Sequence, residues 1–412
     1  MNKKSKIITA ISTVLLIIFF IIAIYLSRRN NIERNLDIKS NTYFYDKDGD
    51  EILSVDFGDT EFFKNINSYY IQATVDNILK DMMNKESISV DEAEQELATG
   101  GYRIYTNQDS KIQTELDKIY NDNNNFIENS DSASIVLDNK TNEVRGVVGG
   151  RNTKNESIYL NSENYVDPFA LMETNRAINS KFQPGTALTL ISVYAYGFEN
   201  GIINKDSIYK DEPLEMSDWK PKNYYREFRG DITIEDAIKI MSNLVAIRVE
   251  KDIGLENSYK FLQDVGISSL DEKDINLASM ALGGLTYGVN LLELSTAYRT
   301  ILNDGIYKSP MFYNKITDTK GEIYLQNNQV TKTIVKQSVC DTIRSIIKDN
   351  INGEEVYLKS DGTNQNFDNW ANGSNNKYTI TTWYGADDLR SINSNKNEAE
   401  FIWKKILEIL PK

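Results

Sequence analysis

One long apolar run near the start of the chain precedes any alternating pattern. From Ile7 to Leu26 nearly every side chain is apolar, with three lysines before the run and two arginines after it. About 20 such residues span the hydrocarbon core of a bilayer. The run is longer than the apolar part of a secretory signal and has no small-residue cleavage site. It predicts an uncleaved transmembrane helix, although positive charge on both flanks leaves its orientation open.

The next part of the chain, residues 30–98, begins with a polar spacer and then shows two short-range patterns. Residues 42–55 alternate on either side of Asp46-Lys-Asp-Gly-Asp, which predicts a hairpin with that segment as its turn. Between residues 69 and 97 the apolar positions recur at helical spacing. We therefore expect a juxtamembrane linker that contains helix.

Residues 99–412 alternate between short strands and longer helices. Residues 133–137 and 143–148 predict a second hairpin, residues 379–384 form a β-branched and aromatic run, and residues 398–410 predict a terminal amphipathic helix. Strands near both ends with helices between them favour an α+β fold with a central antiparallel sheet and helices on both faces. The predicted division of the chain is thus 1–29, 30–98 and 99–412.

Composition excludes several kinds of chemistry. The chain has no histidine and a single cysteine, Cys340. Catalysis that depends on histidine, histidine-ligated metals, thiolate clusters and an internal disulfide are all ruled out, so we expect no metal and no cofactor. Cys340 falls in a helical pattern and is expected to be buried.

Charge argues against a nucleic-acid partner. Without the five cationic residues of the first 29, the chain keeps 41 lysines and arginines against 60 aspartates and glutamates. A chain with this excess of acidic residues gains no binding affinity from displacing the counterions of a nucleic acid. We interpret the acidic excess as a solvated surface.

Several ordered segments resemble the transpeptidase domain of class A penicillin-binding proteins. They include Thr99-Gly-Gly-Tyr-Arg, Ser134-Ile-Val-Leu-Asp, Gln183-Pro-Gly, Trp219-Lys-Pro-Lys-Asn-Tyr, Ala281-Leu-Gly-Gly-Leu-Thr-Tyr-Gly-Val and Trp383-Tyr-Gly-Ala-Asp-Asp. The resemblance implies a fold like that of serine β-lactamases and a body outside the bacterial cell membrane. In that family a glycosyltransferase domain precedes the transpeptidase, but residues 55–99 are too few for a domain. We therefore expect that domain to be missing.

The resemblance also places three motifs: Ser-x-x-Lys, Ser-x-Asn and Lys-Thr-Gly. At the first, Thr186 stands for the nucleophile and Thr189 for the base. At the second, Met241 replaces the serine and Asn243 is kept, with Ser242 as a possible slip of register. At the third, Ser360 and Asp361 precede Gly362 and Thr363, and Lys359 falls one residue early. On a strand this predicts the opposite face, unless a β-bulge restores its direction.

These replacements predict that the acylation chemistry has been lost. Loss of a general base alone typically costs about 10²–10⁴-fold in rate. An acidic Asp361 would also repel the carboxylate of a peptide substrate. We expect the fold to be kept and the three motifs to be degenerate.

Three hypotheses stay open. The favoured one is a pseudo-transpeptidase that acts as a scaffold, decoy or regulator among cell-wall synthesis proteins and binds a stem peptide without turnover. The second is a weak D,D-transpeptidase or carboxypeptidase that uses Thr186 with Lys359. The third is a sensor that binds a muropeptide or β-lactam noncovalently, which the six-residue tail before Ile7 disfavours.

Overall fold

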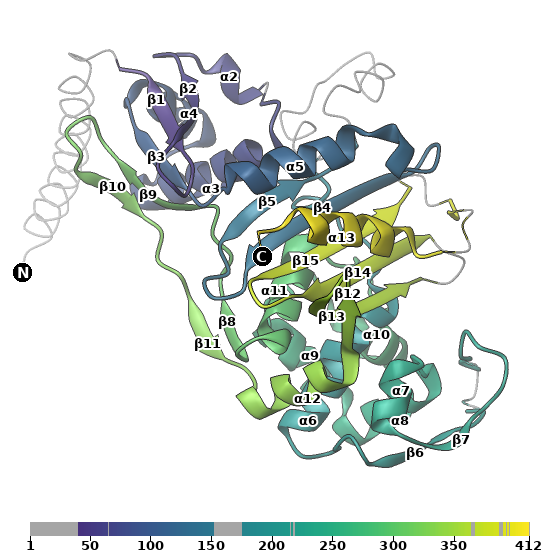
Figure 1. The fold of residues 1–412 in the computed structure, drawn as a ribbon. Helices are drawn as coiled ribbons and strands as arrows, with labels where there is room; N and C mark the ends of the chain where they lie inside the picture. Colours follow the sequence, from purple (N-terminus) through teal and green to yellow (C-terminus); the bar gives the residue numbers. More distant parts are fainter. Residues whose placement is uncertain are drawn as a thin grey trace, which may run out of the picture.

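A six-stranded antiparallel sheet forms the centre of the molecule (Figure 1). The computed structural model describes residues 40–64, 66–151, 175–214, 216, 219–363, 367–386, 390–392, 394 and 396–411; the predicted anchor and most of the polar spacer lie outside them. None of the helices in these ranges is long and apolar enough to cross a membrane. The strand order is β12 (Lys348–Ile351), β13 (Glu354–Gly362), β14 (Asp368–Ser374), β15 (Tyr378–Gly385), β4 (Asp131–Asp138) and β5 (Val144–Val148).

Helices cover both faces of this sheet, as predicted. Figure 1 shows α5 (Ser110–Asn121) and α13 (Glu398–Ile409) in front of it and α11 (Leu291–Leu302) behind it. The remaining helices lie mostly beyond α11: α6 (Tyr196–Glu199), α7 (Ile234–Lys239), α8 (Asn243–Ile253), α9 (Leu255–Asp264), α10 (Leu277–Leu282) and α12 (Gln337–Ile347). Two short strand pairs, β6 (Ile208–Asp211) with β7 (Gly230–Thr233) and β8 (Ile306–Lys308) with β11 (Thr331–Thr333), complete this part.

A second sheet has five strands and joins residues from distant parts of the chain. Its order is β10 (Ile323–Gln326), β9 (Tyr313–Thr317), β3 (Arg103–Thr106), β1 (Thr42–Tyr45) and β2 (Glu51–Val55). The helices α2 (Glu61–Lys64), α3 (Tyr69–Glu86) and α4 (Val90–Thr99) belong to this part of the chain. The predicted boundary at residue 99 was wrong as a division between units, because β1 pairs with β3 across it.

Both predicted hairpins are confirmed, and the predicted helix between residues 69 and 97 is divided in two. Ser87 ends α3 in the left-handed conformation, with φ 56°. Ser89 then starts α4 with a capping box, in which its side chain and that of Glu92 each accept from the other's backbone N–H. The strand at residues 379–384 and the terminal helix are also confirmed, as β15 and α13.

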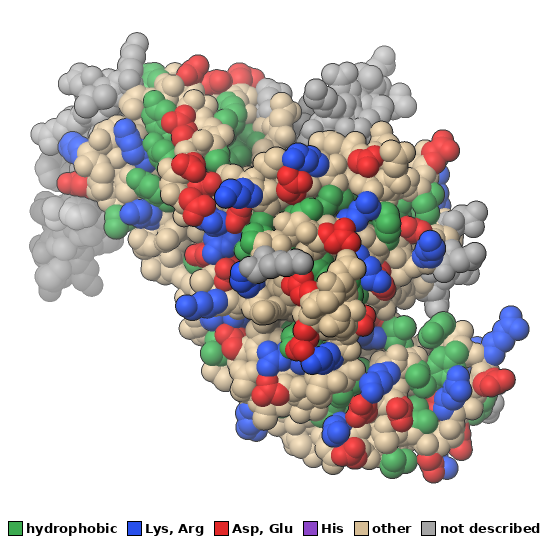
Figure 2. All heavy atoms as spheres, viewed as in Figure 1, with side chains coloured by type: hydrophobic (Ala, Val, Ile, Leu, Met, Phe, Trp, Pro, Cys, Tyr) green, Lys and Arg blue, Asp and Glu red, His purple; other side chains and the backbone are tan. Residues whose placement is uncertain are grey.

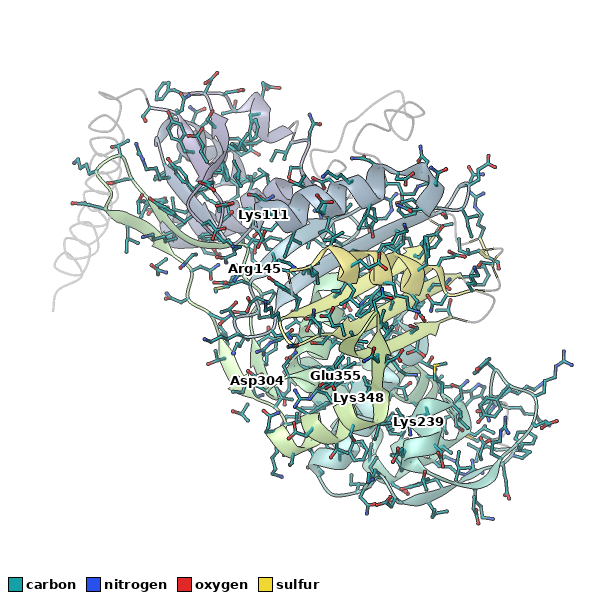
Figure 3. All side chains as sticks on the ribbon, in the orientation of Figure 1. Lys111, Arg145, Lys239, Asp304, Lys348 and Glu355 are labelled. Carbon is teal, nitrogen blue, oxygen red and sulfur yellow. The ribbon has the colours of Figure 1, made fainter. Side chains whose placement is uncertain are left out.

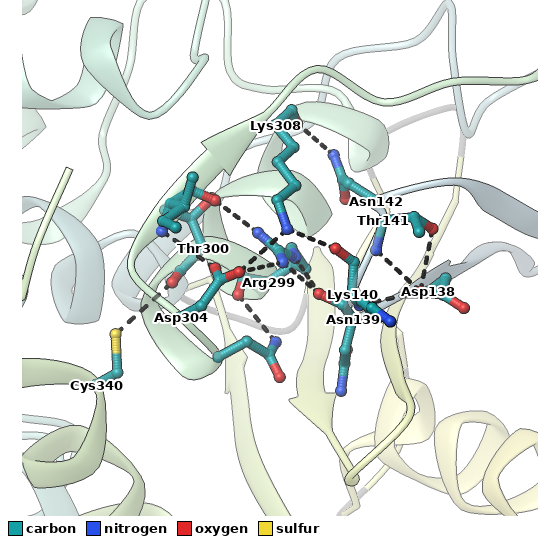
Figure 4. Close-up of polar contacts among 12 residues, drawn as sticks. Asp138, Asn139, Lys140, Thr141, Asn142, Arg299, Thr300, Asp304, Lys308 and Cys340 are labelled. Atoms are coloured by element: carbon teal, nitrogen blue, oxygen red, sulfur yellow. Dashed lines mark hydrogen bonds and ion pairs between the residues drawn. The ribbon is translucent and has the colours of Figure 1, made fainter. Parts of the chain in front are cut away.

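A buried arginine fixes α11 against the turn between β4 and β5 (Figure 4). The Arg299 side chain has no exposure; its Nε donates to the carbonyl of Asn139 at 2.7 Å and it pairs with Asp304 at 2.9 Å. Burial raises the pKa of Asp304, but the charge and hydrogen bond of Arg299, together with hydrogen bonds from Ile306 N and Lys308, outweigh burial and the net shift is downward. Cys340 lies nearby, buried in α12 as predicted, and burial raises the pKa of its thiol to about 12, which makes it unreactive.

Charged side chains of both signs are interspersed over the face seen in Figure 2, with no large area of one sign. Ion pairs hold several of them along elements of the fold. Figure 3 shows Lys348 and Glu355 on neighbouring strands β12 and β13, where they pair, and Lys239 at the end of α7, which pairs with Glu235 at 2.5 Å. Such exposed pairs contribute little to stability.

Candidate functional site

The helical segment that starts at Gly185 carries the first two candidate positions. Residues Gly185–Ala187 form a 3-10 turn, Leu190–Ala195 a π-helical turn and Tyr196–Glu199 the α-helix α6. Thr186 and Thr189 stand three residues apart on this stretch, so both side chains face the same way, as the motif requires.

Backbone contacts fix where the segment begins. The side chain of Gln183 accepts from Leu285 N at 3.0 Å and donates to Leu285 O at 2.6 Å. A Cβ on Gly283, whose φ is +68°, would lie 2.0 Å from the carbonyl oxygen of Gly185. Glycine is therefore required at position 283 for the two chain segments to approach each other.

Residues from separate segments of the chain line one cavity, a hollow of about 280 Å³ that includes space open to solvent. Thr186 and Thr189 come from the helical segment, Met241 from the turn before α8, Asn243 from the first position of α8, and Lys359 from β13. Its other lining residues are Leu190, Tyr194, Ile238, Ser242 and Ala246. The structure thus brings together the candidate positions of the first two motifs, more than 50 residues apart in sequence.

Gly362 and Thr363 lie next to this cavity. A Cβ on Gly185 would lie 3.3 Å from the carbonyl oxygen of Gly362 and 3.4 Å from the Thr363 methyl. The Thr363 hydroxyl accepts from Asp368 N at 2.9 Å and thereby closes the turn from β13 to β14. The third motif therefore meets the first, but the Thr363 side chain is engaged in the turn.

The charged part of the site comes from β13. The Thr186 hydroxyl donates to Oδ1 of Asp361 at 3.0 Å, and Nζ of Lys359 lies 3.5 Å from the same oxygen. The Asp361 side chain is fully buried and that of Lys359 is 11% exposed. One carboxylate oxygen thus joins the candidate nucleophile to the cation.

The prediction that Lys359 points away from the site was wrong. Lys359 and Asp361 are two residues apart on β13 and share a face, whereas Ser360 alternates with them and does not line the cavity. The pairing of β13 with β14 runs without a bulge from Tyr357 to Gly362. Lys359, rather than Ser360, therefore faces the cavity.

Thr189 occupies the place of the base but its hydroxyl is engaged. It is 6% exposed, and its Oγ1 donates to the carbonyl oxygen of Ala281 at 2.7 Å. A neutral hydroxyl that already donates its proton to a carbonyl cannot serve as a base for Thr186. Its role in this structure is to hold the Ala281 segment against the helix.

Met241, which stands where the second motif has its serine, lies in a turn and not on a helix. Met241 has φ 54° and lies in the turn between α7 and α8, so its left-handed backbone, not a helix face, directs its side chain to the cavity. Ser242 is the N-cap of α8 and is 2% exposed, and its hydroxyl donates to Asp211 at 2.7 Å. Asn243 donates to the carbonyl of Lys222 at 2.9 Å. The hydroxyl of Ser242 is thus unavailable as a substitute for the missing serine.

Two residues that sequence analysis missed belong to the site. Asp211 is fully buried and accepts from Ser242, Asn223 and Tyr225 at 2.7–2.9 Å. Burial raises its pKa, but these hydrogen bonds outweigh burial and the net shift is downward. Tyr194 is 4% exposed and lines the cavity, and its hydroxyl has no hydrogen-bond partner among the described residues. No spacing links Asp211 to Ser242, but Tyr194 could have been found eight residues after Thr186 on the same helical stretch.

The described residues contain no group of three or more metal-ligating acidic or cysteine side chains. Chemistry at this cavity would therefore depend on Thr186, Asp361, Lys359 and Tyr194. These supply two hydroxyls, one carboxylate and one cation.

The described residues combine a central antiparallel sheet, helices on both of its faces, and a cavity between the helical segment at Gly185 and strand β13. Residues 133–390 match the family described as the penicillin binding protein transpeptidase domain. The chain belongs to this family.

Individual relatives are distant and longer. The chain is 23% identical over 368 residues to penicillin-binding protein 1A of Clostridium acetobutylicum, covering 81% of this chain and 44% of that protein. It is 26% identical over 338 residues to penicillin-binding protein 1F of Bacillus subtilis, covering 77% and 44%. This chain therefore spans less than half the length of these two relatives.

Among solved structures, the penicillin-binding protein PonA1 from Mycobacterium tuberculosis shares the fold with a TM-score of 0.67. The match has 18% sequence identity and covers 83% of this chain and 91% of that one. At that identity the likeness concerns the fold alone.

Proposed function

We propose that this protein is a pseudo-transpeptidase of peptidoglycan synthesis, anchored in the bacterial cell membrane by the run from Ile7 to Leu26 with its main body outside. It would act as a scaffold or regulator that contacts other cell-wall synthesis proteins. The family and the relatives named above support a role in the cell wall. The shortness of residues 55–99 supports the absence of a glycosyltransferase domain.

The proposed loss of catalysis rests mainly on one observation. Acyl transfer by a hydroxyl needs a group that accepts its proton, and the group three residues after Thr186 is a threonine that donates to the Ala281 carbonyl. The Met241 side chain, in the place of the second hydroxyl, cannot relay a proton. When groups act as a unit, the loss of one already removes most of the rate.

The test is covalent labelling of the full chain in detergent with benzylpenicillin, followed by mass spectrometry. A β-lactam is a suitable probe because PonA1 has been solved in complex with penicillin V. We expect no adduct in the wild type and none in Thr186→Ser, since serine would still lack its base. A Thr186→Ser/Thr189→Lys variant whose fold is checked by circular dichroism should form a detectable adduct.

A second candidate function has one observation in its favour. The Thr186 hydroxyl already donates to Asp361, and Lys359 lies beside that carboxylate. A carboxylate can take a proton from a hydroxyl, so a weak D,D-transpeptidase or carboxypeptidase that acts through Thr186 is the alternative. An adduct on Thr186 of the wild type within minutes, lost in Asp361→Asn, would establish it and overturn the pseudoenzyme.

A further inference from the structure

The Asp361 carboxylate lies beside Lys359, which lines the cavity. Lys359 is the one charged side chain among the described residues that line the cavity. A cation 11% exposed beside such a cavity would ordinarily attract an anionic ligand, because burial strengthens its field and leaves it in need of a partner. Here a carboxylate of the same chain already lies 3.5 Å away.

The position of the Asp361 carboxylate is fixed by its side-chain contacts and by the strand that carries it. Its Oδ1 accepts from the Thr186 hydroxyl at 3.0 Å and faces Nζ of Lys359, and regular pairing of β13 with β14 fixes the backbone on which it stands. Its Oδ2 is buried and has no hydrogen-bond partner among the described residues. A buried oxygen without a hydrogen-bond partner is unusual, and here it belongs to the carboxylate that lies beside Lys359.

We propose that Asp361 is a specificity-determining residue: it acts as an internal carboxylate that occupies Lys359 and so excludes ligands that end in a carboxylate. This rests on the proposed function, because it concerns binding by the same site without acyl transfer. A second carboxylate next to Lys359 would meet the charge of Asp361 at short range. Removing the charge of Asp361 should leave Lys359 unpaired and open to an external carboxylate.

The experiment compares the wild type with Asp361→Asn, Lys359→Met and the double variant, all as full chains in detergent. Binding of N-acetyl-D-alanyl-D-alanine and of its C-terminal amide is measured by isothermal titration calorimetry. Asp361→Asn should bind the free acid at least tenfold more tightly than the wild type does and in preference to the amide. The double variant should lose this gain, since it has no cation.

Thermal unfolding gives a second readout, because an unpaired buried charge destabilises the fold and a bound ligand restores stability. Asp361→Asn should have a lower Tm than the wild type, and the free acid should raise that Tm while the amide does not. A matched control is Asp368→Asn, which removes another buried carboxylate of the same sheet, one that accepts from Trp383 Nε1 at 2.8 Å. It should gain no affinity for the free acid.

Equal affinity of the wild type and Asp361→Asn for the free acid would overturn the proposal. So would a folded Asp361→Asn that does not distinguish acid from amide, or a double variant that keeps the gain. None of these results concerns adduct formation with benzylpenicillin. The proposal for Asp361 can therefore fail while the proposed pseudo-transpeptidase function stands, and the reverse.

Discussion

Glu250 on α8 is an acidic side chain enclosed by the core behind the cavity. It is fully buried, accepts from the Ser258 hydroxyl at 2.7 Å, and its Oε1 has no hydrogen-bond partner among the described residues. Burial raises the pKa of Glu250 from 4.5 to about 7, and the Ser258 hydrogen bond only partly opposes this. The folded protein therefore holds a proton that the unfolded chain releases at lower pH.

The raised pKa of Glu250 makes the stability of the protein fall with rising pH. Between pH 4.5 and 7 the unfolded chain has lost the Glu250 proton while the folded protein keeps it, so the free energy of unfolding falls as pH rises through that window. Glu250→Gln cannot titrate. Relative to the wild type, its free energy of unfolding should rise by roughly 3 kcal/mol between pH 4 and pH 8, as measured by urea denaturation.

The exposed Glu256→Gln on the neighbouring helix α9 is the control for replacing a glutamate by glutamine on a helix outside the core. Because both variants are compared with the wild type at each pH, the titration of all other groups cancels. A difference for Glu250→Gln that is independent of pH would contradict the raised pKa.

At the site, the sequence predicted positions that follow from local spacing and missed those that depend on alternation or on distant contacts. Thr186 and Thr189 were found because a fixed offset from Gln183-Pro-Gly and a spacing of three on a helix place both. Lys359 was assigned to the wrong face because counting back from Gly362 cannot tell which face of a strand turns inward. Asp211 reaches Ser242 from 31 residues away, through packing that no periodicity encodes.

At the scale of elements, the site depends on the close contact between the end of α10 and the start of the helical segment at Gly185. Gly283 is the left-handed C-cap of α10, and a side chain there would collide with the Gly185 carbonyl. Gly288 makes a similar approach, since a Cβ on it would lie 2.4 Å from the Phe182 carbonyl oxygen. These two glycines set how close the segment 283–288 can come to the residues before Thr186.

Gly283→Ala should therefore destabilise the protein by at least about 2 kcal/mol, because it combines a collision with backbone and a left-handed φ. The adjacent Gly284→Ala is the matched control: its Cβ would meet nothing closer than 3.6 Å, and its effect should stay within roughly 0.5 kcal/mol. Urea denaturation of the two variants measures both. Equal effects would mean that the segment can shift away from Gly185 at little cost.

Elements whose signals are local were predicted well. The hairpin turn at Asp46 is specified by a side chain that accepts from the backbone N–H groups of Asp48 and Asp50, a signal contained in five residues. The turn at Met241 carries no such signal. Methionine rarely adopts a positive φ, so the contacts between Ser242 and Asp211 must hold the turn in place, and its sequence resembles a continuing helix.

At the scale of the whole molecule, residues 40–98 pack into the five-stranded sheet and against the central sheet, and do not form a separate spacer. Phe44 and Ile104, from opposite sides of residue 99, share a core cluster with Ile316 of β9. Tyr70 of α3 extends the connection to the central sheet, because its hydroxyl donates to the carbonyls of Val144 and Phe312 at 2.8 and 3.0 Å. The sequence did not predict this arrangement, since it depends on pairing β3 with strands more than 50 residues before it and 200 residues after it.

A chain that begins at residue 99 should therefore fail to fold as a stable unit, whereas a chain that begins at residue 40 should unfold cooperatively. The shorter chain would leave β3 without its parallel partner β1 and expose the apolar face of Ile104, Tyr313 and Ile316.

Tyr70→Phe in the longer chain tests the same packing with a smaller change, because it keeps the ring and removes only the hydroxyl that donates to two buried carbonyls. It should cost about 1–3 kcal/mol. Differential scanning calorimetry of the three proteins tests this: a cooperative transition of the 99–412 chain within a few degrees of the 40–412 chain would mean that residues 40–98 add a separate layer and do not complete the core.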